Sequence, residues 1–66
     1  MLQELGRRVR RARESSRLTQ EAAASLAGID YKRYQRLEAG TVNATMRTLV
    51  RVAEAFGTDV WKMMAE

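Results

Sequence analysis

The stretch "AAASLAGID", residues 22–30, places small side chains at the centre of a chain of only 66 residues. A chain this short has barely enough core to fold, so without disulfides or a metal it depends on close helix packing or a partner. Methyl-sized side chains let a neighbouring helix come near. We therefore predict a close crossing of two helices, with Ala24 at the crossing, Gly28 keeping bulk out of the turn, and Leu26 and Ile29 as apolar flanks.

Capping residues around this stretch define the two helices. Thr19 is a good N-cap, and Gly28 is a natural left-handed residue at the end of the helix that carries the alanines. Asp30 then caps a further helix, "YKRYQRLEA", which ends at Gly40. About three residues join the two helices, so the pattern predicts a helix-turn-helix whose second helix is held outward.

Three further helices are predicted from apolar spacing and capping residues. One runs from Gln3 to Ser15, one follows the N-cap Thr45 and ends at Gly57, and a short one follows Asp59. The expected inner faces are Leu5, Val9 and Ala12 in the first of these, and Met46, Leu49, Val52, Ala53 and Phe56 in the second. The prediction is an all-α, compact five-helix domain over residues 1–66.

Composition narrows the possible functions. The chain has no cysteine and no histidine, which removes thiolate metal sites, the commonest metal ligand and the usual general base. It also has no glycine-rich phosphate loop and no convincing carboxylate pair, so we expect neither an enzyme nor a metal or cofactor. No apolar run reaches the length of a membrane span, and the N-terminus shows no export signal. The expected location is the cytoplasm, at the nucleoid.

The charge is unevenly distributed. Lys and Arg number 12 against 8 Asp and Glu, a net charge of +4. Residues 1–47 carry ten bases and five acids, a net of +5, whereas residues 48–66 carry two bases and three acids, a net of −1. This distribution suggests a face directed at a polyanion, with assembly elsewhere. A merely solubilising surface would give the same totals.

Residues 18–40, "LTQEAAASLAGIDYKRYQRLEAG", resemble the Cro/CI-type helix-turn-helix family, the lambda-repressor-like or XRE domains. Counting from Gln20, a small residue falls at the fifth place, glycine at the ninth and leucine at the eighteenth, namely Ala24, Gly28 and Leu37. Residues 38–40, "EAG", and residues 51–57, "RVAEAFG", also resemble the family pattern. The resemblance extends over nearly the whole chain. The resemblance implies a DNA-binding regulator that inserts its third helix into the major groove of double-stranded DNA.

Four positions depart from the family pattern. Arg17 stands where glycine is common, Ala23 where leucine is common, and Ala44 where proline is common. Tyr34 replaces a branched aliphatic residue, so its hydroxyl must find a partner or reach water. These departures concern local packing and loop stiffness, not the fold.

The third helix indicates groove binding without the resemblance. At about 100° per residue, Tyr34, Leu37 and Glu38 cluster on one side. The other side carries three bases and no acid: Tyr31, Lys32, Arg33, Gln35 and Arg36. Lys and Arg can donate to guanine O6 and N7, and Gln can bond adenine bidentately. The alternative is an ordinary solvated helix face.

The resemblance implies a role for each of these side chains. The base-reading positions are Tyr31, Lys32, Gln35 and Arg36, and the phosphate-contacting positions are Gln20, Arg33, Asn43, Thr45 and Arg47. Phosphate contacts of this kind position a protein without specifying sequence. The resemblance further pairs Arg13 with Glu38 as a structural ion pair beneath the third helix, the alternative for Arg13 being a phosphate contact.

The tail "VWKMM", residues 60–64, carries more apolar groups than one short helix can bury. Val60 and either Met63 or Met64 are expected in the core. Trp61, with Met64, is expected at a dimer seam, because large aromatic residues anchor interfaces. A fully intramolecular tail is the alternative. A two-fold homodimer, common in the family, would place two recognition helices about 34 Å apart.

The sequence as a whole favours a dimeric, sequence-specific transcriptional regulator, by default a repressor, on a palindromic site. The alternative is an antitoxin-like or scaffold module whose main partner is a protein and whose DNA binding is secondary. RNA binding is disfavoured, because no aromatic stacking platform on a sheet is expected.

Overall fold

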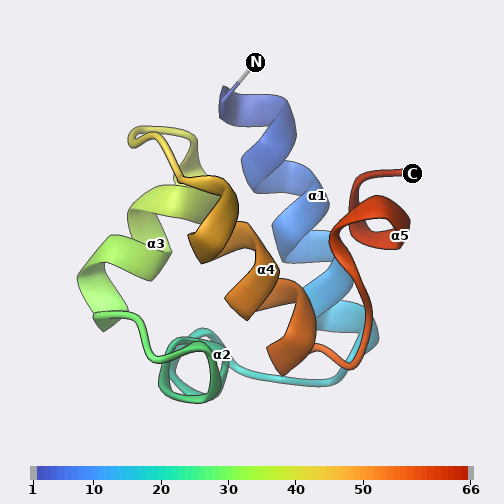
Figure 1. Ribbon diagram of the computed structural model, residues 1–66. Helices are drawn as coiled ribbons and strands as arrows, with labels where there is room; N and C mark the ends of the chain where they lie inside the picture. Colours follow the sequence, from blue (N-terminus) through green and yellow to red (C-terminus); the bar gives the residue numbers. More distant parts are fainter. Residues whose placement is uncertain (1, 66) are drawn as a thin grey trace.

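The structure is a computed structural model that describes residues 2–65, and all the regular elements in that range are α-helices. In chain order they are α1 (Leu2–Ser15), α2 (Gln20–Ala27), α3 (Tyr31–Ala39), α4 (Met46–Ala55) and α5 (Val60–Met64). Helices α3 and α5 lie on opposite sides of the molecule, with α1 and α4 between them and α2 across one end (Figure 1). The predicted five-helix, all-α architecture is confirmed.

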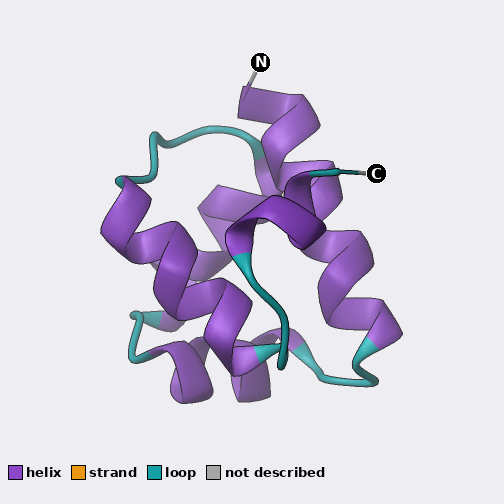
Figure 2. Ribbon diagram, turned by 45° about the vertical axis from the view of Figure 1, so that its right-hand side comes forward, coloured by secondary structure: helices purple, strands orange, loops and turns teal. Residues whose placement is uncertain are grey.

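Each of the four later helices begins at the N-cap that the sequence predicts. Thr19, Asp30, Thr45 and Asp59 each accept a hydrogen bond from a backbone N–H of the first turn, at 2.8–3.3 Å. These bonds satisfy donors that have no partner inside the helix. Short loops join the helices (Figure 2).

The core is small and rich in small residues. Its largest fully buried side chains are Val9, Tyr34 and Val52. The other buried apolar residues are Ala23, Ala24, Ala27, Leu37, Leu49, Ala53 and Met63. Helix α2 packs against both α3 and α4, which explains why three of its alanines are buried. Larger side chains on α2 would push these helices apart.

Three packing expectations are wrong. A Cβ atom built on Gly28 would meet no atom within 4 Å, so this glycine does not keep bulk out of the turn; its left-handed φ of 69° is what requires it. Leu26 is 62% exposed and does not flank the crossing. Met46 is 63% exposed: it is the first residue of α4, and the buried residues of that helix begin only at Leu49.

A close backbone contact lies elsewhere, between α1 and the end of α3. A Cβ atom on Gly6 would stand 2.3 Å from the Glu38 carbonyl oxygen and 2.7 Å from that of Leu37. A Cβ atom on Gly40, just after α3, would stand 2.6 Å from the Cα of Gln3. Backbone therefore touches backbone here, and α1 holds the C-terminal end of α3 directly.

Arg17 has a left-handed backbone, with φ of 58°, a conformation that favours glycine. We expect Arg17→Gly to stabilise the protein by about 0.5–1 kcal/mol, because relief of roughly 1–2 kcal/mol of left-handed strain exceeds the added entropy of an unfolded glycine. Urea denaturation should show a higher midpoint with an unchanged slope. Arg17→Ala removes the charge but keeps the strain, and a gain of equal size in that variant would contradict the explanation.

Within residues 2–65, no helix combines the length and apolar character needed to cross a membrane.

Candidate nucleic-acid interface

Helix α3 presents two chemically different faces. Tyr34, Leu37 and Glu38 are buried against the rest of the protein. The five side chains on the other face are exposed: Tyr31, Lys32, Arg33, Gln35 and Arg36. Three of these five are cationic and none is acidic. The structure therefore brings all four predicted base-reading residues, together with Arg33, onto one outward surface.

Two of the outward side chains contact each other. Gln35 Nε2 donates to the hydroxyl of Tyr31 at 3.1 Å, one helical turn away. This bond holds the amide of Gln35 against the helix surface. The guanidinium of Arg36 and the ammonium of Lys32 extend from the same exposed face.

The turn that precedes α3 fixes where the helix starts. The N–H of Gly28 donates to the Ser25 carbonyl at 3.2 Å, and the N–H of Ile29 donates to the Ala24 carbonyl at 2.9 Å. These bonds satisfy the last carbonyls of α2 while the left-handed Gly28 reverses the chain. Asp30 then caps α3 through the N–H groups of Lys32 and Arg33. The exposed face of α3 consequently begins directly after a rigid turn.

A buried carboxylate holds the inner face of α3 in place. Glu38, whose side chain is 1% exposed, accepts hydrogen bonds from Arg13 Nε at 2.7 Å and Nη2 at 3.3 Å. It also accepts from the Tyr34 hydroxyl at 2.5 Å and from Gln20 Nε2 at 2.9 Å, and Arg10 Nε lies 3.5 Å from Oε1. One carboxylate thus joins α1, α2 and α3.

The electrostatics of this cluster follow from burial and pairing. Burial alone would raise the pKa of Glu38, but hydrogen bonds from Arg13, Tyr34 and Gln20 outweigh it and lower that pKa below its ordinary value. The bond to Glu38 raises the pKa of Arg13. Burial, followed by the bond to Glu38, raises the pKa of Tyr34 far above its ordinary value. The hydroxyl of Tyr34 therefore remains protonated and donates to Glu38. This bond provides the partner that a buried tyrosine hydroxyl needs.

Gln20 lies at the first residue of α2, half-buried, with its amide nitrogen on Glu38. A primary amide has two N–H donors, and one of them is occupied by this bond. The predicted phosphate contact would have to use the second amide proton or the free backbone N–H groups of the helix start. Gln20 thus links the carboxylate cluster to the surface on which DNA is expected.

The other expected phosphate contacts gather around the start of α4. Asn43 and Arg47 are exposed, whereas the hydroxyl of Thr45 is engaged in capping, at 3.1 Å from the Thr48 N–H and 3.0 Å from its hydroxyl. Asn43 and Arg33 line the same shallow hollow between α3 and the loop that follows it. The structure therefore places candidates from two elements beside each other.

The predicted seam residues lie far from α3, on α5. Trp61 is 84% exposed, whereas Met64 is half-buried against the core and its carbonyl accepts a hydrogen bond from Arg8. Met63 is the buried residue of α5. Trp61 is therefore more accessible to a partner than Met64, the other residue expected at a dimer seam.

Two further residues position α3, and neither is predicted from the sequence. Gly6 allows the backbones of α1 and α3 to touch, and Arg10 adds a second cation beside Glu38. Together with Arg13 they occupy positions i, i+4 and i+7 of α1, which lie on one helix face. These three residues lie outside the apolar stripe of α1, so their spacing alone does not predict a contact face.

Comparison with known proteins places these features in context. A family model described as a helix-turn-helix domain matches residues 4–61. The structure is also similar to the crystal structure of the restriction-modification controller protein C.AhdI from Aeromonas hydrophila, with a TM-score of 0.90 and 27% sequence identity over 94% of each chain. No curated protein matches the chain.

Proposed function

Because this chain belongs to the helix-turn-helix domain family, of the Cro/CI type, we propose that it is a sequence-specific transcriptional regulator that inserts α3 into the major groove of double-stranded DNA. The observation that carries the proposal is the contrast between the two faces of α3. Its inner face is held by the buried Glu38 cluster, and its outer face is cationic and unobstructed. Similarity to a restriction-modification controller protein supports the regulatory role.

Sequence would be read by the outward side chains of α3. Arg36 and Lys32 are suited to guanine, Gln35 to adenine, and Tyr31 to a thymine methyl group or a phosphate. For Gln35 to bond a base bidentately, it must leave the hydroxyl of Tyr31. These two residues would therefore act together at neighbouring bases.

Affinity would come mainly from phosphate neutralisation and be steeply salt-dependent. The proposed contacts are Gln20, Arg33, Asn43, Thr45 and Arg47. Because the hydroxyl of Thr45 is already bonded to Thr48, its contribution would come through the capped start of α4, where free N–H groups attract anions. These contacts would set the register of α3 in the groove.

We further propose a two-fold homodimer on a palindromic site, with Trp61 at the seam, acting by default as a repressor. Selection of bound sequences from a random duplex pool tests this directly, because a dimer yields a palindromic consensus. If no duplex is retarded even at low salt, the chain is instead a protein-interaction module.

The Arg36→Ala variant should weaken binding to the selected site by about 1–3 kcal/mol, or roughly 5- to 150-fold, with reduced preference at one base position. The reason is the loss of a bidentate contact to guanine. Fluorescence anisotropy with the selected duplex and single-base variants of it measures both effects. Arg47→Ala is the matched control: it should weaken all duplexes alike and reduce the salt slope by about 0.9. An unchanged consensus for Arg36→Ala would contradict the base-reading role.

A further inference from the structure

Glu38 has more cations around it than its single negative charge requires. The guanidinium groups of Arg10 and Arg13 both lie within ion-pair distance of its carboxylate, at 3.5 and 2.7 Å. Arg13 bonds Glu38 through two nitrogens and is largely buried, so Arg13 alone balances the buried charge. The side chain of Arg10, by contrast, is 50% exposed. The cluster therefore has one positive charge in excess, and that charge lies at the surface.

Gln20 lies beside this excess charge. Its Nε2 donates to Oε1 of Glu38 at 2.9 Å, and Nε of Arg10 lies 3.5 Å from the same oxygen, so the two side chains are neighbours. Among residues 2–65, neither side chain has a partner other than Glu38. A primary amide keeps a second N–H when one is bonded, and a guanidinium has several N–H groups. Arg10 and Gln20 therefore have donors to spare, next to each other and next to a positive charge.

These donors lie at one edge of the outward face of α3. Glu38 follows Gln35 by three residues, which places the two side chains about 60° apart around the helix. Arg33 lies about 140° from Glu38, across the buried side chains of Tyr34 and Leu37. The outward face of α3 is thus bordered by Glu38 along one edge and by Arg33 along the other.

The edge at Arg33 already has candidate phosphate contacts. Arg33 and Asn43 line the same shallow hollow there. The major groove is about 12 Å wide and has a phosphate backbone along each of its two sides. A helix that lies in the groove consequently meets phosphates at both edges of its outward face. Arg10 and Gln20 are the groups available at the second edge.

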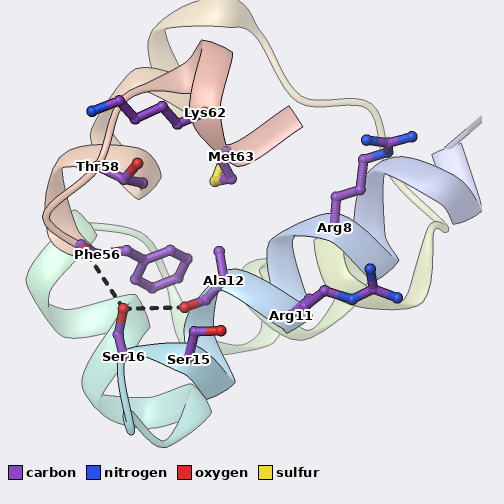
Figure 3. A pocket seen from close by; sticks show the side chains of 9 residues that line it. All are labelled: Arg8, Arg11, Ala12, Ser15, Ser16, Phe56, Thr58, Lys62 and Met63. Carbon is purple, nitrogen blue, oxygen red and sulfur yellow. Dashed lines mark hydrogen bonds between the residues drawn. The ribbon is translucent and has the colours of Figure 1, made fainter. Parts of the chain in front are cut away.

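Two neighbouring arginines of α1 lie on the other side of that helix. Arg8 lies about 200° around α1 from Arg10, and Arg11 lies about 200° from Arg13. Both line a hollow of about 300 Å³ between α1 and α5, together with Phe56 (Figure 3). Helix α5 and α3 are on opposite sides of the molecule (Figure 1). Of these four arginines, Arg10 is the one that is both exposed and on the side of α3.

We infer, on the premise of the DNA binding proposed for α3, that Arg10 and Gln20 together bind one phosphate group of the DNA backbone, at the edge of α3 opposite Arg33. A guanidinium with an amide beside it can donate to the non-bridging oxygens of a single phosphate, a ligand that arginine suits well. Glu38 does not repel the phosphate strongly, because its side chain is 1% exposed and Arg13 balances its charge.

Duplexes that each carry one neutral methylphosphonate test this contact. The probe is the duplex selected from the random pool, with its phosphates replaced one at a time, and fluorescence anisotropy measures binding. For wild type, replacement of the phosphate bound by Arg10 should weaken binding about tenfold, as expected for charge-assisted hydrogen bonds. Arg10→Gln should bind the unmodified duplex less tightly by a similar factor, and replacement of that phosphate should weaken its binding much less than it weakens wild type.

Three further variants separate a contact from an effect on folding. Gln20→Ala should lose sensitivity at the same phosphate as Arg10→Gln. Arg10→Gln should also reduce the salt slope by about 0.9, and Arg10→Lys, which keeps the charge, should restore it. Arg11→Gln is the matched control, because it removes a charge from the side of α1 that lines the hollow. It should keep the wild-type slope and the wild-type sensitivity at every phosphate. Circular dichroism checks that each variant is folded.

Two results would overturn the inference and leave DNA binding intact. In the first, Arg10→Gln keeps the wild-type sensitivity at every phosphate, so that any loss of affinity is the same for all duplexes and Arg10 only supports the fold. In the second, Arg10→Gln and Gln20→Ala lose sensitivity at different phosphates, so that they share no site. A wild-type protein that binds no duplex even at low salt would instead overturn the DNA-binding proposal, and the phosphate site with it.

Discussion

The Gly6→Ala variant should lose at least about 2 kcal/mol of folding stability, although alanine is the better helix former by roughly 1 kcal/mol. The added methyl group would stand 2.3 Å from the Glu38 carbonyl oxygen and 2.8 Å from its carbonyl carbon. Both neighbours are backbone atoms of α3, which cannot rotate away as a side chain would. Helix α1 must therefore separate from α3, and the packing beneath α3 is lost.

A loss of this size is large for so small a protein. At about 0.05–0.15 kcal/mol per residue, a chain of 66 residues has a total stability of ~3–10 kcal/mol. Urea denaturation followed by circular dichroism measures the change. The fraction that still folds should bind the selected duplex less tightly, because α3 is displaced.

Gly57→Ala is the matched control for this substitution. Gly57 has a left-handed φ of 71°, but a Cβ atom there would meet nothing within 4 Å. That variant should therefore show only backbone strain, roughly 1 kcal/mol, and should bind DNA normally once folded. If Gly6→Ala were no more harmful than Gly57→Ala, the backbone contact between α1 and α3 would not be holding α3 in place.

The Glu38→Gln variant should lose about 3–5 kcal/mol, because it leaves Arg13 charged and shielded without its counter-ion. The side chain of Arg13 is 13% exposed and bonds Glu38 through two nitrogens. Glutamine retains the size of glutamate but places an NH₂ group where one carboxylate oxygen accepted two hydrogen bonds, either from Arg13 and Gln20 or from Arg13 and Tyr34. Arg10, whose side chain is half exposed, would turn to water without comparable loss.

Two further variants separate the charge from the shape. Glu54→Gln removes an exposed carboxylate from α4 and should change stability by less than about 0.5 kcal/mol. In a double-mutant cycle, Arg13→Met combined with Glu38→Gln should lose less than the sum of the single changes, since the unpaired charge is gone. Additive losses would mean that the two residues do not act as a pair.

The same carboxylate predicts how stability depends on pH. The folded-state pKa of Glu38 lies below its ordinary value of 4.5, so its contribution is present above the unfolded pKa and is lost as the pH falls through the folded value. Wild-type stability should thus decline below about pH 5, and Glu38→Gln should show a shallower decline over that range. Equal slopes for both proteins would show that Glu38 titrates alike in the folded and unfolded states.

Local features of this fold were predictable from the sequence, and non-local ones were only partly so. The caps Thr19 and Asp30 are determined by hydrogen bonds within three residues, so the sequence alone locates them. The exposed face of α3 also follows from helical spacing. By contrast, the contact of Gly6 with Glu38 joins residues 32 positions apart. The spacing of Gly6, Arg10 and Arg13 places them on one face of α1, but it does not specify which helix that face contacts. Leu26 shows the same difficulty in reverse, because its apolar side chain predicts burial whereas it is 62% exposed.

The roles of polar residues were hardest to predict in full. Gln20 matches a phosphate-contacting position by resemblance, yet its amide nitrogen bonds Glu38. The hydroxyl of Tyr34 required a partner, but which one depended on the burial of the carboxylate one turn later. Such networks arise from three-dimensional packing, and each member can be assigned only once the others are placed.

The shortness of α3 limits how much sequence one protomer can distinguish. Nine residues at 1.5 Å each make a rod of about 13 Å, which parallels roughly four base pairs at 3.4 Å per step. A DNA sequence of about four base pairs recurs by chance throughout any genome, which offers about 10⁶–10⁹ competing nonspecific sites. A single copy would thus be bound nearly always at chance sites. Only two copies joined in fixed register would recognise a DNA sequence long enough to be rare.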